Sequence, residues 1–168
     1  MTRRKPRLSP SLESDTDEEI PALNFFTKFP RFEYDPQKPV SQEFKRLGVK
    51  MGWRQGSRKW KKNWNLCMDE QYDRLIGTRV NNLDTWQQMC QKLMITGEFT
   101  SIRQCRKALS GTFVNLVDLL DCWESDKCPK RFRSHTALAE YTKAECMFVS
   151  RKIVKQDKAL AGLLKRIF

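Results

Sequence analysis

The chain has 168 residues and a formal net charge of +12, and 39% of its residues are hydrophobic, among them five Trp and ten Phe. This length and apolar content predict one domain with a proper core, since a domain of about 150 residues buries roughly 68–70% of its unfolded surface. No stretch approaches the roughly 18 apolar residues of a membrane span, and the charged N-terminus lacks the apolar core of a signal peptide. We therefore expect a protein of the nucleus or cytoplasm that is not secreted, with reduced cysteines and no membrane partner.

The positive charge is concentrated in two blocks. Residues 41–80 carry ten basic and four acidic side chains, and residues 127–168 carry eleven basic and three acidic ones. The stretch between them, 81–126, has four basic and six acidic side chains. If folding brings the two blocks together, they form one surface suited to phosphates or to an acidic protein. The plainer alternative is a solvated surface that only keeps the protein in solution.

Two segments precede the predicted body. Residues 1–20 combine a basic cluster with a Ser/Asp/Glu run, a composition typical of a disordered tail. Residues 21–40 contain four prolines and five aromatic rings, which predict an extended arm packed across the body. The alternative for this arm is a short linear motif that docks on a partner. Residues 41–168 are predicted to form a single helical domain.

Apolar residues recur at helical spacing throughout 41–168, which predicts an all-α fold of about seven short to medium helices. In the longest of them, over 57–76, Ser57 is the predicted N-cap and Gly77 the predicted end. Ser41 is the predicted cap of the first helix. The helix over 116–123 is apolar almost all round, which predicts a central position. The helices are predicted over 42–52, 57–76, 83–94, 102–109, 116–123, 135–145 and 151–168.

Several short motifs are spread over residues 25–168. They are Phe32-x-Tyr34-Asp35-Pro36, Glu43-Phe44-x-Arg46-Leu47, Gly52-Trp53, Trp86-Gln87-x-x-Cys90, Ser101-Ile102-x-Gln104-Cys105-x-Lys107-Ala108-Leu109, Val114-Asn115-Leu116-Val117-Asp118-Leu119 and Leu163-Leu164-Lys165-Arg166-Ile167-Phe168. Together they resemble a group of small uncharacterised intracellular proteins of filamentous fungi with no assigned activity. The resemblance implies one self-contained domain and transfers no functional residue.

Cysteine and histidine offer two candidate chemistries. Cys122, Cys128, His135 and Cys146 formally make a Cys3His zinc set, although no tight CxxC pair is present. Cys128 and His135 are also a conceivable nucleophilic pair. Unpaired cysteines are among the most buried residue types, and Cys67, Cys90 and Cys105 lie in apolar stripes. Since no P-loop, GxGxxG, GxSxG or HExxH pattern is present either, we predict no enzyme, no metal and no cofactor.

The basic blocks carry interleaved aromatic rings, and cations neutralise phosphates while an exposed ring can stack on a base. Trp53 and Phe132 are the predicted exposed rings, whereas Trp60 and Trp64 are predicted to lie in the core. No helix-turn-helix, RRM or finger motif is present, so we predict non-enzymatic nucleic-acid or chromatin binding with little sequence specificity. The alternative is a protein–protein adaptor that uses the aromatic arm and the basic face. The predicted binding residues are Trp53, Arg54, Arg58, Lys59, Lys61, Lys62, Lys127, Lys130, Arg131, Phe132 and Arg133.

Overall fold

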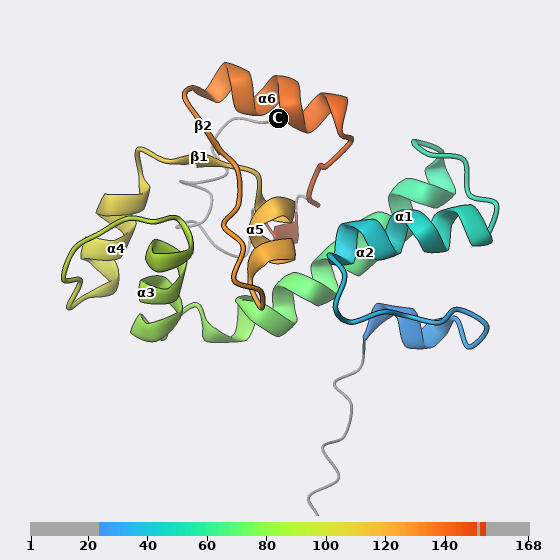
Figure 1. Cartoon of the computed structure of the whole chain (residues 1–168), viewed down its shortest axis with the longest axis horizontal. Helices are drawn as coiled ribbons and strands as arrows, with labels where there is room; N and C mark the ends of the chain where they lie inside the picture. Colours follow the sequence, from blue (N-terminus) through green and yellow to red (C-terminus); the bar gives the residue numbers. More distant parts are fainter. Residues whose placement is uncertain (1–23, 151, 154–168) are drawn as a thin grey trace, which may run out of the picture.

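The computed structural model describes residues 24–150 and 152–153, and this part of the chain is mostly helical (Figure 1). The predicted all-α class is confirmed, with six α-helices, two short 3-10 helices and one pair of two-residue strands among the described residues. The predicted tail over 1–20 lies outside them, as does most of the helix predicted over 151–168, of which Lys152 and Ile153 are helical. The elements are η1 (Phe25–Lys28), α1 (Val40–Lys50), α2 (Arg58–Leu75), η2 (Gly77–Arg79), α3 (Leu83–Lys92), α4 (Ile102–Leu109), β1 (Phe113–Val114), α5 (Leu116–Cys122), β2 (Arg131–Phe132) and α6 (His135–Ala144).

Helix α2 links the two ends of the molecule (Figure 1). The Ser57 hydroxyl accepts a hydrogen bond from the Trp60 backbone N–H at 3.2 Å, which confirms the predicted N-cap. The helix ends at Leu75 with Ile76 as its C-cap, within one residue of the predicted end. Gly77 does not adopt the left-handed conformation predicted for it and opens η2 instead. The buried stripe of α2 consists of Trp60, Trp64, Cys67, Met68, Tyr72 and Leu75.

Ser41 is not a helix cap, contrary to the prediction. Helix α1 begins at Val40, the residue before Ser41, and Ser41 is buried within the helix. Its backbone N–H donates to the Asp121 carboxylate on α5 at 3.0 Å, and its hydroxyl donates to the same carboxylate. A residue type that sequence assigns to local capping is therefore used for a contact between helices 80 residues apart.

Helix α5 is central, as predicted. It packs against both α1 and α2, and its apolar face is buried. The Asn115 side chain caps its start by accepting from the Val117 backbone N–H at 2.8 Å. The same side chain donates to the Thr142 hydroxyl of α6 at 2.9 Å and to the Met147 carbonyl at 3.1 Å. One buried amide thus ties α5 to α6 and to the segment after it.

The segment 21–40 is not extended throughout, because Phe25–Lys28 form the 3-10 helix η1. Its rings do pack on the helical body, as predicted. Phe25 and Phe26 are buried, and the Phe25 ring centre lies 5.9 Å from that of Phe44 on α1. Phe26 stacks on Tyr34 with ring centres 4.5 Å apart. The described part of the arm, 24–39, is therefore a part of the core and not a free linker.

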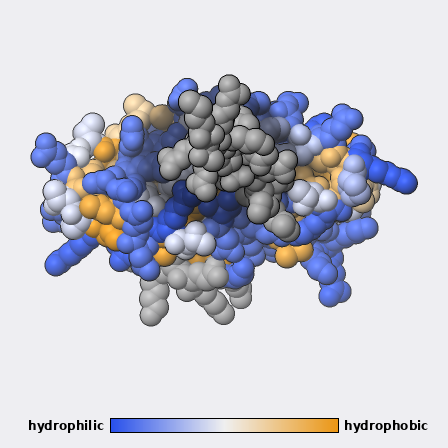
Figure 2. Space-filling view, turned by 90° about the horizontal axis from the view of Figure 1, so that it is seen from below, coloured by the Kyte–Doolittle hydropathy of each residue, from blue (hydrophilic) through white to orange (hydrophobic). Residues whose placement is uncertain are grey.

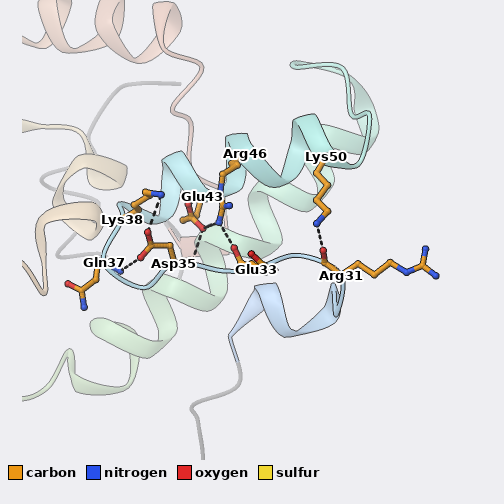
Figure 3. A network of polar contacts seen from close by, with 8 residues as sticks. All are labelled: Arg31, Glu33, Asp35, Gln37, Lys38, Glu43, Arg46 and Lys50. Carbon is orange, nitrogen blue, oxygen red and sulfur yellow. Dashed lines mark hydrogen bonds and ion pairs between the residues drawn. The ribbon is translucent and has the colours of Figure 1, made fainter.

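A buried carboxylate on α1 fastens the arm (Figure 3). Glu43 accepts hydrogen bonds from the Asp35 backbone N–H at 2.9 Å and from Arg46 Nε at 3.0 Å and Nη2 at 2.5 Å. Arg46 also donates to the Glu33 carbonyl, and its guanidinium carbon lies 4.5 Å from the centre of the Phe32 ring. Burying a carboxylate is costly unless its oxygens are hydrogen-bonded, and here both are. Glu43 therefore fixes where the arm crosses α1.

The strand pair was only half predicted. The aromatic and β-branched residues 112–114 predict a brief extended stretch, which is confirmed as β1. Its partner β2 lies within 127–133, a highly charged stretch whose sequence predicts a loop. The strands are antiparallel, with Phe113 opposite Phe132 and Val114 opposite Arg131. Both strands pack against α6. No helix in the described residues is long and apolar enough to cross a lipid bilayer.

Substitution of Glu43 with Gln tests the fastening of the arm. The amide presents an N–H toward donors, so one buried hydrogen bond is lost and we expect the free energy of unfolding to fall by about 2–3 kcal/mol. The measurement is urea unfolding followed by tryptophan fluorescence. Glu33→Gln is the matched control, since the Glu33 side chain is exposed and Arg46 hydrogen-bonds to its backbone carbonyl, and its effect should stay within about 0.5 kcal/mol. Equal effects of the two substitutions would contradict the role given to Glu43.

Asp118→Asn tests a pH-dependent contact between α5 and α6. Burial raises the pKa of Asp118 to about 6. A hydrogen bond from the Tyr141 hydroxyl at 3.1 Å lowers this pKa, but burial has the larger effect. The folded state therefore holds a proton that the unfolded state releases, and stability falls as pH rises from about 4 to about 6. Over this pH range the free energy of unfolding of the Asn variant should fall by about 1–2 kcal/mol less than that of the wild type. This figure is reduced for partial solvent screening.

The measurement for Asp118 is urea unfolding of both proteins across this pH range. Asp126→Asn, at an exposed carboxylate in the loop after α5, is the control and should keep the wild-type profile. Parallel pH profiles for the wild type and Asp118→Asn would show that Asp118 is not the titrating group.

Candidate nucleic-acid interface

Seven exposed cations gather where the arm, α1 and the start of α2 meet, at the right-hand end of Figure 1. We call this set the basic corner. Five of its members are predicted binding residues, and the arm and the end of α1 add two more. The basic corner consists of Arg31, Lys50, Arg54, Arg58, Lys59, Lys61 and Lys62.

The basic corner has no acidic counterpart. Between Glu43 and Asp69 the chain contains no carboxylate, and none of the seven cations forms an ion pair with a described residue. Arg58 and Lys59 also lie in the first turn of α2, where the helix dipole already presents positive partial charge. Like charges placed there lower the stability of the helix by about 0.3–1 kcal/mol each, so the arrangement is not explained by folding.

Arg31 and Lys50 were not predicted as binding residues. The Lys50 ammonium donates to the Arg31 carbonyl, while the Arg31 side chain points away from the protein (Figure 3). Arg31 belongs to the aromatic arm, and only the folding of that arm over α1 brings it to the basic corner. No local sequence signal could have found it.

Trp53 is not an exposed ring, contrary to the prediction. It is only 8% exposed, and its ring centre lies 5.6 Å from that of Phe29 and 5.9 Å from that of Phe44. Lys59 covers the ring at 5.9 Å from its centre. Trp60 and Trp64 are buried and stack at 5.0 Å, which confirms their assignment to the core. The basic corner therefore presents cations without an exposed aromatic ring for a base to stack on.

The part of the second basic block that holds predicted binding residues, 127–133, does not join the basic corner. It follows α5 and contains β2, which lies beside α6 in the other half of the molecule (Figure 1). Its residues make internal contacts instead. The Lys130 ammonium lies 5.2 Å from the centre of the Phe132 ring and 5.0 Å from that of Tyr141, and Arg131 donates to the Leu93 carbonyl at 3.2 Å. Phe132 is half-buried against Tyr141 with ring centres 4.8 Å apart.

Within 127–133, Lys127 and Arg133 are the exposed cations whose side chains form no hydrogen bond, ion pair or ring contact with the described part of the chain. The two blocks therefore do not meet in one surface within the described residues, and Lys130, Arg131 and Phe132 make contacts inside the protein. These three side chains hold β2 against α3 and α6.

Hydrophobic surface gathers toward both ends of the long axis on the face shown in Figure 2, with hydrophilic side chains over most of the rest. At the basic corner, Val49 is 83% exposed and Met51 43% exposed. At the opposite end Met94 is exposed beside a cavity of about 640 Å³ between the end of α3 and residues 95–100. The basic corner thus combines cations with exposed apolar side chains.

Three cysteines lie in the core, as predicted. Cys67, Cys90 and Cys105 are buried. Burial raises the pKa of the Cys67 thiol well above its usual value. Burial, with a smaller contribution from the neighbouring Cys105, raises the pKa of Cys90 to about 12. The Cys67 and Cys90 thiols therefore stay protonated at neutral pH, and a protonated thiol is a poor nucleophile and a poor metal ligand.

The residues of the conceivable zinc set are not brought together. Cys128 is exposed in the loop before β2, whereas Cys122 and Cys146 are half-buried at the ends of different helices. No group of three or more His, Cys, Asp or Glu side chains in the described part of the chain is placed to hold a metal ion. No hydrogen bond within that part joins Cys128 to His135, whose Nε2 is buried without a partner.

Comparison with known proteins adds no assignment. No protein-family model matches the chain, and neither a curated protein nor a solved structure matches it. The resemblance to fungal intracellular proteins therefore stays a prediction.

Trp53→Leu distinguishes a core ring from a base-stacking ring. The leucine keeps an apolar side chain but removes the ring, so we expect a loss of stability of about 1–3 kcal/mol. Nucleic-acid affinity of the folded variant should stay within about twofold, since loss of a stacked ring costs about 1–3 kcal/mol of binding. Urea unfolding and oligonucleotide binding measure the two effects. A folded variant that binds about tenfold more weakly would restore the stacking role.

Proposed function

We propose that this protein binds nucleic acid through phosphate contacts at the basic corner, without catalysis and with little sequence specificity. The single observation behind the proposal is the gathering of seven exposed cations with no carboxylate partner at one end of the molecule. Duplex DNA carries one negative charge per about 1.7 Å of its axis, so closely spaced cations meet several phosphates at once. The proposal includes a location in the nucleus or cytoplasm.

The chemistry of the basic corner favours contacts with the backbone over recognition of bases. Arg58 and Lys62 are four residue steps apart on the helix, or about 6 Å along its axis, and this distance covers only a few phosphates. The indole rings of this region are buried, so they do not stack on bases. Lysine and arginine supply donors for phosphate oxygens, and sequence-specific recognition requires further contacts to base edges.

An acidic protein is the second candidate for the same surface. The observation that favours it is the exposed apolar pair Val49 and Met51 beside the cations, since protein ligands bring apolar side chains and a phosphate backbone does not. The aromatic arm is less suited to be a docking motif, because Phe25, Phe26 and Phe32 are buried in the protein's own core.

The test is binding to labelled DNA and RNA oligonucleotides of several lengths across a salt series. For five to seven phosphate contacts, the slope of log affinity against log salt on duplex DNA should lie near −4 to −6 (~0.9 per contact). Lys61→Glu with Lys62→Glu should reduce this slope by about 2 and weaken binding by at least about 50-fold at 0.1 M salt.

Arg103→Glu with Lys107→Glu is the matched control. It makes the same change in net charge on α4, at the opposite end of the molecule, where both side chains are exposed. The control should keep the wild-type slope. Affinity weaker than ~100 μM at moderate salt, or equal losses in both double variants, would contradict the proposal.

A further inference from the structure

A cavity of about 240 Å³ opens at the basic corner, between the turn after η1 and the end of α1. Phe29, Pro30 and Met51 supply apolar lining, and Arg31 and Lys50 contribute cations. Lys28 also lines the cavity, and its ammonium is paired with the Glu70 carboxylate of α2. A water molecule occupies about 30 Å³ in the liquid, so the cavity has room for an aliphatic side chain. Met51 is 43% exposed, and the adjacent Val49 is 83% exposed.

The cations and the apolar lining of this cavity together indicate which kind of ligand fits it. Phosphates satisfy the cations but bring nothing apolar for Phe29 and Met51. A peptide with several carboxylates next to an aliphatic side chain matches both features, because the carboxylates pair with cations while the apolar group leaves water. Charge complementarity of this kind sets which segment docks and how fast it does so.

The chain contains such a segment directly before its described part. Residues 13–20 read Glu-Ser-Asp-Thr-Asp-Glu-Glu-Ile, with five carboxylates followed by Ile20. Ile20 is four residues before Asn24, where the described structure begins, so an extended chain places it up to about 14 Å from that residue. The lining of the cavity begins at Lys28. The four-residue 3-10 helix η1, which is about 8 Å long, separates Lys28 from Asn24.

We propose that the acidic segment 13–20 docks on the basic corner of its own chain, with Ile20 in the cavity between Phe29 and Met51. Its carboxylates then face Arg31 and Lys50 and extend toward the start of α2. The consequence for nucleic-acid binding rests on the function proposed above, since the segment and the phosphates compete for the same cations. Nucleic acid gains full access only when the segment is displaced.

Carbodiimide crosslinking of the full chain tests the docking without nucleic acid. This reagent joins a carboxylate to an amine only when the two are in contact, and mass spectrometry identifies the pair. We expect carboxylates of 13–19 to link to Lys28 and Lys50 more often than to Lys107 on α4 or Lys127 after α5. Ile20→Asn should reduce the yield, and Leu12→Asn, on the other side of the acidic run, should not. An even distribution over these lysines would overturn the proposal.

Oligonucleotide binding tests the competition. In one variant, Asp15→Asn, Asp17→Asn, Glu18→Gln and Glu19→Gln neutralise four of the five carboxylates of the segment. In a matched control, Asp84→Asn, Glu98→Gln, Asp126→Asn and Glu140→Gln make the same change in net charge at exposed carboxylates elsewhere. Each phosphate contact that the first variant frees should tighten duplex DNA binding about tenfold at 0.1 M salt and steepen the salt slope by about 0.9. The control should keep the wild-type slope.

The two measurements separate the two proposals. Specific crosslinks to Lys28 and Lys50 without any oligonucleotide binding support the docking and sink the nucleic-acid function. Measurable oligonucleotide binding with equal slopes in both variants and evenly distributed crosslinks overturns the docking and leaves the nucleic-acid function standing.

Discussion

The packing of rings around Phe44 is the contact on which the N-terminal half depends. Phe44 is fully buried on α1 and lies against four rings from the arm, the turn and α2. The ring centres are 5.9 Å away for Phe25, 5.9 Å for Trp53, 5.4 Å for Trp60 and 5.2 Å for Trp64. Because three segments are held by one side chain, none of them can shift without opening a void, and losing a buried aromatic costs about 3–5 kcal/mol. The positions of the cations in the basic corner follow from this packing.

The same packing separates two kinds of residue that alternate in the sequence. Around Trp53 and Trp60 the aromatic side chains turn inward to Phe44, which leaves Arg54, Arg58 and Lys59 on the outside. The indole rings are buried in the core, so the outer face offers cations and the aliphatic side chains of Val49 and Met51. Charge without rings or base-edge contacts gives affinity that depends on salt and hardly on sequence. The chemistry of the proposed interface is thus a consequence of how the core is filled.

Much of the local structure could be predicted, because capping and helical periodicity depend on neighbours a few residues away. Ser57 caps the helix expected of it, and Trp60 and Trp64 lie on the expected buried stripe. Ser41 was mispredicted because its partner is Asp121, far along the chain. The pairing of β1 with β2 was missed for the same reason, since a two-residue strand has no periodicity of its own.

The sequence by itself determined the helical class, the apolar face of each helix and the excess of positive charge, since these depend on composition and on spacings of three and four residues. It also determined that no carboxylate lies between Glu43 and Asp69 to compensate that charge. Only the tertiary structure decided which cations are available. It engages Lys130 and Arg131 in contacts with Tyr141 and the Leu93 carbonyl, and it brings Arg31 to the basic corner. The physical reason is that a cation is free or engaged according to which distant segment packs beside it, and the sequence does not show which segment that is.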